Sequence, residues 1–107
     1  MNWEILFLPE AVDDLKALDG SQRKLVRKAI NKVSQNPLPE SEGGYGKTLG
    51  NKHGSNLSGL LKIKLRDAGI RIVYALKRTE HGMLIVVIGA RADDEVYKIA
   101  EKRKPQI

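Results

Sequence analysis

Hydrophobic and polar positions alternate in the second half of the chain in the way that β-strands require. Residues 60–65 place apolar side chains on one face and Lys62 and Lys64 on the other. Residues 70–76 predict a second strand across a short turn. Residues 83–88 are apolar on both faces, which is typical of a central strand. We therefore expect three consecutive strands joined by tight turns.

The first half predicts one strand followed by two helices. Residues 3–8 form an apolar strand that stops at Pro9, and Pro9 suits the first turn of a helix. That helix is expected to end near Gly20, and Ser21 is expected to cap the next one. The second helix should end at the proline-rich residues 36–39. Its predicted apolar stripe consists of Leu25, Ala29, Ile30 and Val33.

The remaining segments complete the predicted fold. Residues 37–58 are rich in Gly, Pro, Ser and Asn and predict a long surface loop, held to the body by Leu49 and Leu57. A short C-terminal helix should open at Asp93 or Asp94. The order β-α-α-β-β-β-α predicts a small α+β domain with a mostly antiparallel sheet. We expect the two N-terminal helices and the short C-terminal helix to pack over one face of this sheet. With 107 residues, the chain has room for a single domain.

Composition narrows the class of protein. The chain has no cysteine, so disulfides, cysteine nucleophiles and thiolate metal sites are excluded. No apolar run is long enough for a membrane span, and the N-terminus lacks the features of a secretion signal, so we expect a cytoplasmic protein. The net charge is +6. Residues 21–36 carry five bases and no acid, which predicts a positive face for a polyanion or an acidic protein, although a merely solvated face is the alternative.

Five side chains could gather on one face of the sheet. Lys62 and Lys64 project from the same side of one strand, and Arg71 lies on the neighbouring strand. Arg91 follows the central strand, and Tyr97 lies on the last helix. Each has an ordinary reading as well: exposed lysines are common, Arg91 could pair with a nearby acid, and a tyrosine on a terminal helix is usually a core residue. Spacing alone therefore only suggests a site.

Two stretches of the sequence resemble a known family. Residues 61–74, LKIKLRDAGIRIVY, are similar to the central motif of the RelE toxins of the RelE/ParE superfamily, and residues 87–97, VIGARADDEVY, are similar to the end of that domain. The resemblance spans nearly the whole chain. It implies a RelE/ParE-like fold and a catalytic, RNA-binding set made of Lys62, Lys64, Arg71, Arg91 and Tyr97.

The resemblance also implies a function and partners. It implies the toxin of a type II toxin–antitoxin system, which cleaves messenger RNA on the ribosome and is held inactive by an acidic antitoxin in a hetero-oligomer. The implied reaction is attack of a ribose 2′-hydroxyl on the adjacent phosphate, and it requires no metal or other cofactor. Arginine forks suit phosphate binding. Crowding by like charges should lower the pKa of one lysine, so that Lys62 or Lys64 serves as general base. The resemblance points to Arg91 as the group that protonates the leaving oxygen.

Other functions stay open at this stage. A ParE-type poison of DNA gyrase would share the fold but act by protein binding, and an inactive member would bind only RNA or antitoxin. A two-histidine mechanism would need His53 and His81 to converge, and the acids at 93–95 are better explained as helix-capping residues than as metal ligands. Sequence-independent contacts with ribosomal RNA are expected from further bases. These are Arg23, Lys24, Arg27, Lys28, Lys32 and Arg66.

Overall fold

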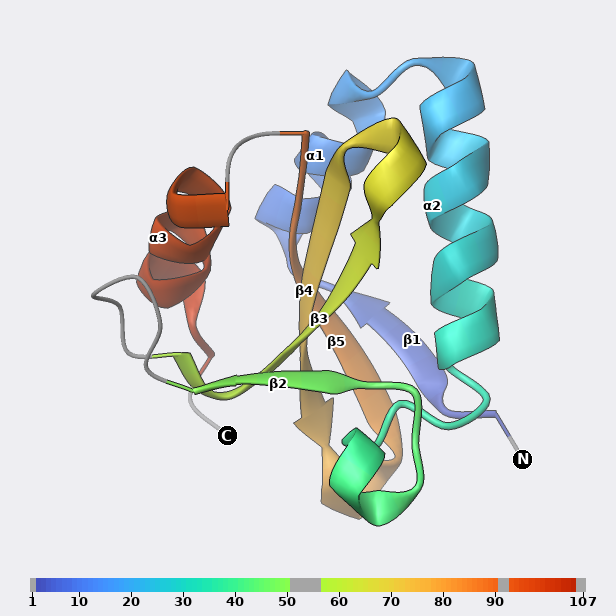
Figure 1. The fold of residues 1–107 in the computed structure, drawn as a ribbon, viewed down its shortest axis with the longest axis vertical. Coiled ribbons are helices and arrows are strands. Elements are labelled where there is room, and N and C mark those ends of the chain that lie inside the picture. The colour runs from blue at the N-terminus through green and yellow to red at the C-terminus, as the bar shows by residue number, and fades with distance from the viewer. Residues whose placement is uncertain (1, 51–56, 91–92, 106–107) are drawn as a thin grey trace.

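The computed structural model describes residues 2–50, 57–90 and 93–105. The elements follow one another as expected, with one additional strand (Figure 1). They are β1 (Glu4–Phe7), α1 (Pro9–Ala17), α2 (Gly20–Val33), β2 (Lys47–Gly50), β3 (Leu57–Leu65), β4 (Ile70–Lys77), β5 (Gly82–Gly89) and α3 (Asp93–Arg103). Among these described elements, no helix is both long enough and apolar enough to cross a membrane.

The strands form one sheet in the order β1-β5-β4-β3-β2. The three pairs β2–β3, β3–β4 and β4–β5 are antiparallel, and β1 joins the edge in parallel to β5. The predicted mostly antiparallel α+β fold is therefore confirmed. The sequence predicted that β3 and β4 are neighbours in the sheet. They pair in antiparallel register, with Leu60 opposite Ala75 at one end and Leu65 opposite Ile70 at the other.

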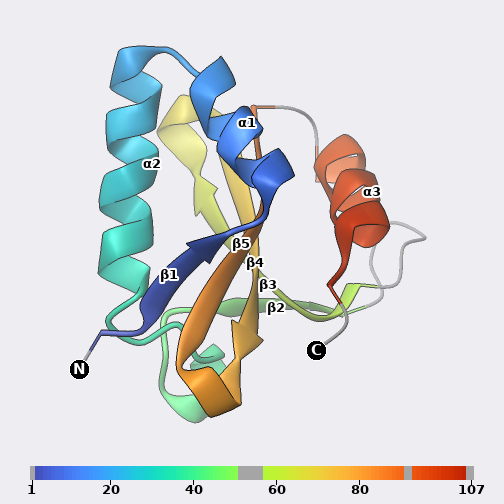
Figure 2. The same ribbon diagram turned by 180° about the vertical axis from the view of Figure 1, so that it is seen from behind.

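Helices cover both faces of the sheet. The helices α1 and α2 lie on one face, as expected, whereas α3 lies on the other, contrary to the expectation that all helices share a face (Figures 1 and 2). The α2 side holds Val26 and Ile30 against Ile72 and Ile85. The α3 side holds Val73, Ala75, Val86, Val96 and Ala100. Period-two alternation along β4 divides its residues between these two cores.

An ion pair connects α1 and α3 across the end of β5. Arg103 donates hydrogen bonds to the Asp14 carboxylate at 2.6 and 3.3 Å, and also to the carbonyl oxygen of Val86 at 3.1 Å. The same carboxylate accepts a hydrogen bond from the backbone N–H of Ile88 at 3.0 Å. Both side chains are only about one-fifth exposed. This network holds α3 against the sheet.

The start and the apolar face of α2 differ from the sequence prediction. Asp19, not Ser21, caps the helix: its carboxylate accepts the backbone N–H of Gln22, whose side chain accepts the backbone N–H of Asp19 in return. Such a reciprocal box satisfies two helix-end donors at once. Leu25 is also misassigned, since it is 49% exposed. The buried positions are Val26, Ile30 and Val33.

The segment expected to be one long loop contains an ordered turn and a strand. A 3₁₀ turn spans Glu40–Glu42, and β2 follows it. The prediction of a loop across 37–58 is therefore wrong for the 3₁₀ turn and for β2. The sequence did not reveal β2 because this edge strand has only four residues, too few to show a clear alternation of polar and apolar positions. The predicted anchoring roles are confirmed, because Leu49 and Leu57 are buried in the core beneath α3.

Candidate functional site

A cluster of cations occupies the face of the sheet that α3 covers only in part. Lys64 lies directly opposite Arg71 in the antiparallel pair of β3 and β4. Lys62 precedes Lys64 by two positions and so shares its face. Lys47 of β2 lies directly opposite Lys62. Side chains at directly opposed positions stand side by side on the same face, with Cβ atoms about 4.5–5.5 Å apart. We call these four residues the cationic cluster.

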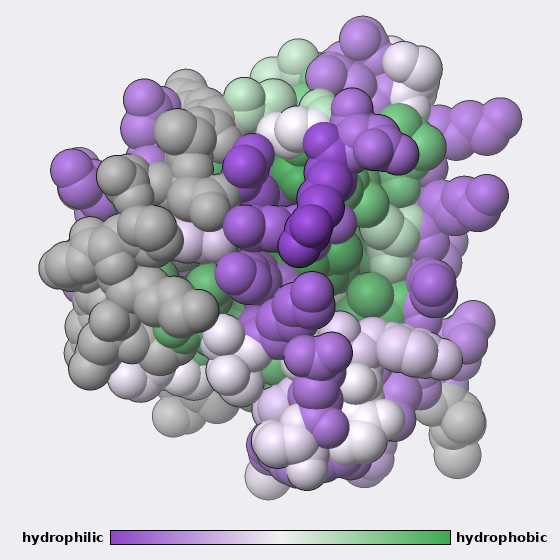
Figure 3. Space-filling view, viewed as in Figure 1, coloured by the Kyte–Doolittle hydropathy of each residue, from purple (hydrophilic) through white to green (hydrophobic). Residues whose placement is uncertain are grey.

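The surface around the cluster is both charged and hollowed. In the view of Figure 3, hydrophilic residues form a band down the middle of the face over β3 and β4, with hydrophobic residues visible between that band and α2. Lys47, Lys62 and Lys64 line a surface pocket of about 450 Å³ together with Arg66. Lys64, Arg66 and Arg71 line a second pocket of about 210 Å³. The cluster therefore surrounds open space large enough for an anion.

Lys47 was missed by the sequence prediction. It belongs to the segment assigned to a loop, where no register with β3 was expected. The available signal was weak: Lys47 and Leu49 alternate around Thr48 over three residues only. Its pairing with Lys62 depends on β2, which forms the edge of the sheet next to β3.

The two remaining predicted site residues, Tyr97 and Arg91, are not part of the cationic cluster. Tyr97 is fully buried, and its ring belongs to the core beneath α3 together with Val73 and Val86. The buried ring positions α3 next to the cationic cluster and presents no open face for a ligand. Arg91 lies outside the described residues. The chain leads toward it from Gly89, which pairs with Arg71 at the end of β5.

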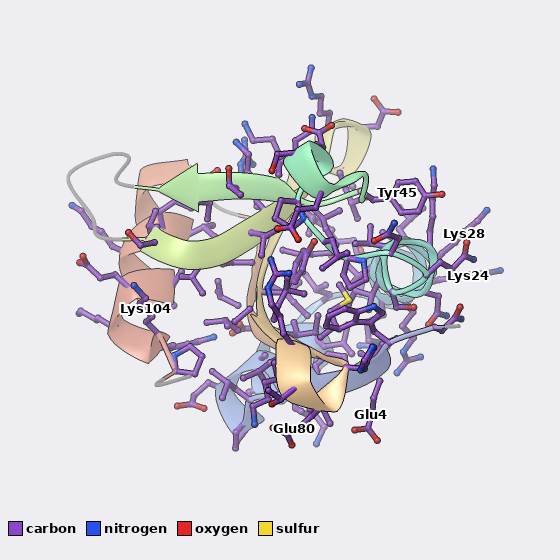
Figure 4. The ribbon with its side chains drawn as sticks, turned by 90° about the horizontal axis from the view of Figure 1, so that it is seen from below. Glu4, Lys24, Lys28, Tyr45, Glu80 and Lys104 are labelled. Carbon is purple, nitrogen blue, oxygen red and sulfur yellow. The ribbon has the colours of Figure 1, made fainter. Side chains whose placement is uncertain are left out.

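The bases of α2 form a separate positive surface. Lys24, Lys28 and Lys32 recur at a spacing of four and are all exposed, so they lie along one stripe of the helix. Figure 4 shows Lys24 and Lys28 projecting away from the body of the molecule. Arg27 is also exposed. Arg23 differs, because its guanidinium donates to the carbonyl oxygens of Lys16 and Leu18 at the end of α1 and so joins the two helices.

The histidine alternative gains no support from the described residues. His81 lies in the turn between β4 and β5, where its ring packs against that of Trp3 with centroids 5.0 Å apart. The cationic cluster lies toward the other end of β4, where Arg71 pairs with Lys64. His53 lies outside the described residues.

This arrangement suits the stabilisation of a negatively charged phosphoryl group. Cations fixed on a sheet need no rearrangement when charge develops on the phosphoryl oxygens, and such preorganised groups usually make the largest contribution to catalysis of this type. Arg71 is steadied by a hydrogen bond of 3.1 Å to the carbonyl oxygen of Gly69. Arginine adds a planar fork for two phosphate oxygens, and lysine adds a point charge.

Comparison with known proteins gives a consistent picture. The chain is 28% identical over 104 residues to a RelE-like toxin protein of Escherichia coli, covering 96% of this chain and 98% of the relative. A doubly substituted E. coli toxin RelE in the free state matches with a TM-score of 0.74 and 24% identity, covering 98% of this chain and all of the other. The same variant in complex with a peptide of the antitoxin RelB matches with a TM-score of 0.70 and 25% identity, covering 96% of this chain and 98% of the other. No protein-family model matches the chain.

Proposed function

We propose that this chain, which is similar in sequence and fold to RelE toxins of the RelE/ParE superfamily, is the toxin of a type II toxin–antitoxin system, a cytoplasmic endoribonuclease that cleaves messenger RNA on the ribosome. The observation that carries this proposal is the placement of Lys64 opposite Arg71, with Lys62 on the same face. Three cations at adjacent positions of two paired strands are suited to binding one phosphate of the RNA backbone.

The proposed reaction is an internal transesterification. The 2′-oxygen of a ribose attacks the adjacent phosphorus, the bond from phosphorus to the 5′-oxygen breaks, and a 2′,3′-cyclic phosphate remains. Lys62 or Lys64 accepts the proton of the 2′-hydroxyl. Arg71 and the other lysine stabilise the charge on the phosphoryl oxygens. Arg91 protonates the departing 5′-oxygen, as the resemblance implies, and the nucleophile is supplied by the RNA itself.

Tyr97 has a supporting role in this proposal. Because its ring is fully buried, it holds α3 beside the cationic cluster. A direct contact of Tyr97 with RNA would require its ring to leave the core when the substrate binds.

The positive surfaces are suited to bind two proposed partners, ribosomal RNA and an acidic antitoxin. The α2 bases Lys24, Arg27, Lys28 and Lys32, with Arg66, would contact the phosphates of ribosomal RNA without reading sequence. An acidic antitoxin would cover the cationic face and form a toxin–antitoxin hetero-oligomer. The similarity to a RelE variant that was solved with an antitoxin peptide supports this second partner.

The test is cleavage of a defined messenger RNA by the purified protein, with and without programmed ribosomes. Wild-type protein should cut the message on ribosomes, and Lys64→Ala and Arg91→Ala should each slow cutting by at least about 100-fold. Lys77→Ala is the matched control, since Lys77 is a partly exposed lysine at the far end of β4. It should cut at the wild-type rate.

Two outcomes would refute the proposal. Intact RNA together with inhibition of gyrase supercoiling in a parallel reaction would move the protein to the ParE type. Full cleavage by both Lys64→Ala and Arg91→Ala would show that the active residues lie elsewhere.

A further inference from the structure

Tyr45 is an aromatic side chain presented to solvent beside the cationic cluster. Its side chain is 51% exposed, and among the described residues only Leu25 is a comparably exposed large hydrophobic residue. Exposed aromatic surface is unfavourable in water, since a buried ring removes far more apolar area from solvent. The location of Tyr45, next to bases from three different elements, suggests a ligand with a flat ring and a negative charge.

The loop that carries Tyr45 has a fixed conformation. The backbone N–H of Tyr45 donates to the carbonyl oxygen of Asn36 at 2.9 Å, and the N–H of Gly46 donates to that of Leu38 at 2.9 Å. Both neighbours of Tyr45 are glycines in close packing. A Cβ atom on Gly44 would lie 2.0 Å from the carbonyl oxygen of Leu38, and one on Gly46 would lie 2.4 Å from the hydroxyl of Tyr74. The ring is thus presented by a rigid turn, which lowers the entropic cost of binding.

Cations surround the exposed ring. The ammonium group of Lys32 lies 6.0 Å from the centre of the Tyr45 ring. Tyr45 also lines the pocket of about 450 Å³ that contains Lys47, Lys62 and Arg66; among the described residues of the lining, Asp67 is the one carboxylate. Figure 4 shows Tyr45 beside α2, on the side from which Lys24 and Lys28 project. Tyr45 therefore connects the α2 stripe to the cationic cluster.

We propose that Tyr45 and this pocket form a subsite for one nucleotide of single-stranded RNA, an inference that rests on the proposed function. The base stacks on the Tyr45 ring, and the phosphates on either side contact Lys32 and Lys47. Stacking on an aromatic ring within a positive groove is how single strands are bound without sequence preference. The pocket volume lies within the range of about 300–1,000 Å³ that is usual for small-molecule sites.

Nucleotide chemistry fits the subsite better than an acidic peptide. A nucleotide carries a planar ring and a phosphate in one unit, and the subsite offers an aromatic face and ammonium groups within one pocket. An acidic peptide matches the charge but leaves the exposed ring without a partner. RNA that passes over Tyr45 would then continue from the α2 stripe toward Lys62 and Lys64.

Binding of an uncleavable RNA tests this inference separately from catalysis. The probe is a fluorescein-labelled 2′-O-methyl RNA of nine nucleotides, which lacks the attacking hydroxyl, and fluorescence anisotropy measures its affinity for the full chain. Tyr45→Ala should weaken binding by about 5- to 100-fold, and Tyr45→Trp should retain or strengthen it. Leu25→Ala is the matched control, since Leu25 is equally exposed but does not line the pocket. It should bind as wild type does.

Salt dependence distinguishes the stacking residue from the charged ones. Tyr45→Ala should leave the slope of log K against log salt unchanged, because no phosphate contact is lost. Lys47→Ala should reduce the slope by about 0.7, the value expected for one contact with a single strand. Equal melting temperatures for the wild type and Tyr45→Ala would confirm that the exposed ring is not needed for folding.

Two results would overturn the subsite. An affinity of Tyr45→Ala within twofold of Leu25→Ala would show that the ring takes no part in RNA binding. If Tyr45→Ala weakens the binding of a polyglutamate peptide as much as it weakens the binding of RNA, the surface is a docking site for an acidic protein instead. Ribosome-dependent cleavage by the wild-type protein in the same preparation would leave the proposed function intact in either case.

Discussion

The hydroxyl of Tyr74 donates a hydrogen bond of 2.8 Å to the carbonyl oxygen of Pro37. Tyr74 is fully buried in the middle of β4, and Pro37 lies just after α2. This contact joins the centre of the sheet to the turn that leads to Tyr45 and Lys47. Burial raises the pKa of the Tyr74 phenol above its ordinary value of 10, so the donor keeps its proton at every pH at which the protein would be studied.

Removing this hydroxyl should destabilise the protein and loosen the turn. Tyr74→Phe leaves the carbonyl of Pro37 without its donor, and a buried acceptor that loses its partner costs about 1–3 kcal/mol. Urea denaturation followed by circular dichroism would measure the loss. Tyr45→Phe is the control, because it removes the hydroxyl of an exposed tyrosine and should change stability by less than about 0.5 kcal/mol. Equal stabilities for the two variants would contradict the structural role of the Tyr74 hydroxyl.

Asp14 should matter more to stability than any exposed acid on its helix. Asp14→Ala deprives Arg103 of its carboxylate partner and the N–H of Ile88 of its acceptor, and leaves Arg103 only the carbonyl oxygen of Val86. Because the pair is partly exposed, we expect a loss of about 1–3 kcal/mol, below the range for fully buried pairs. Asp13→Ala removes an exposed neighbouring carboxylate and should have little effect. Hydrogen exchange should locate the damage in α3, and unchanged protection of α3 would count against the anchoring role of Asp14.

The sequence predicted which strand residues share a face, because strand periodicity determines the side to which each side chain points. Lys62 and Lys64 alternate with apolar residues, and a short turn to β4 places Arg71 opposite Lys64. The same reasoning failed for Lys47, whose strand is too short to show a period and pairs through an irregular register.

Helix periodicity gave a less reliable result for α2. Leu25 and Val26 are adjacent apolar residues, and only packing against the sheet decides which of them is buried. The burial of Tyr97 also depends on packing. Because α3 covers the face opposite α1 and α2, the Tyr97 ring lies in a second core that the order of elements did not predict.

The ion pair between Glu42 and Arg78 should make stability depend on pH. Arg78 donates two hydrogen bonds to the Glu42 carboxylate, at 2.9 and 2.7 Å, and they lower the pKa of Glu42 below its ordinary value of 4.5. A carboxyl group with a lowered native pKa stabilises the fold above its unfolded pKa, and this contribution is lost as the pH falls through the native value. Wild type should therefore melt at a higher temperature than Glu42→Gln at pH 7, by a small margin, since the pair is exposed. The margin should disappear at about pH 2, and a margin that is independent of pH would assign the effect to something other than charge.

Lys47 should contribute to RNA cleavage through its charge. It stands opposite Lys62 and lines the same pocket, so Lys47→Ala removes one positive charge from beside the bound phosphate. We expect cleavage on ribosomes to slow by about 10-fold, a smaller effect than for Lys64→Ala, because Lys47 lies one strand further from Arg71. Lys47→Arg keeps the charge and should retain most of the activity. Thr48→Ala changes the adjacent exposed residue of β2 and provides the control. If Lys47→Ala and Thr48→Ala cut RNA equally fast, the active part of the cationic cluster is confined to β3 and β4.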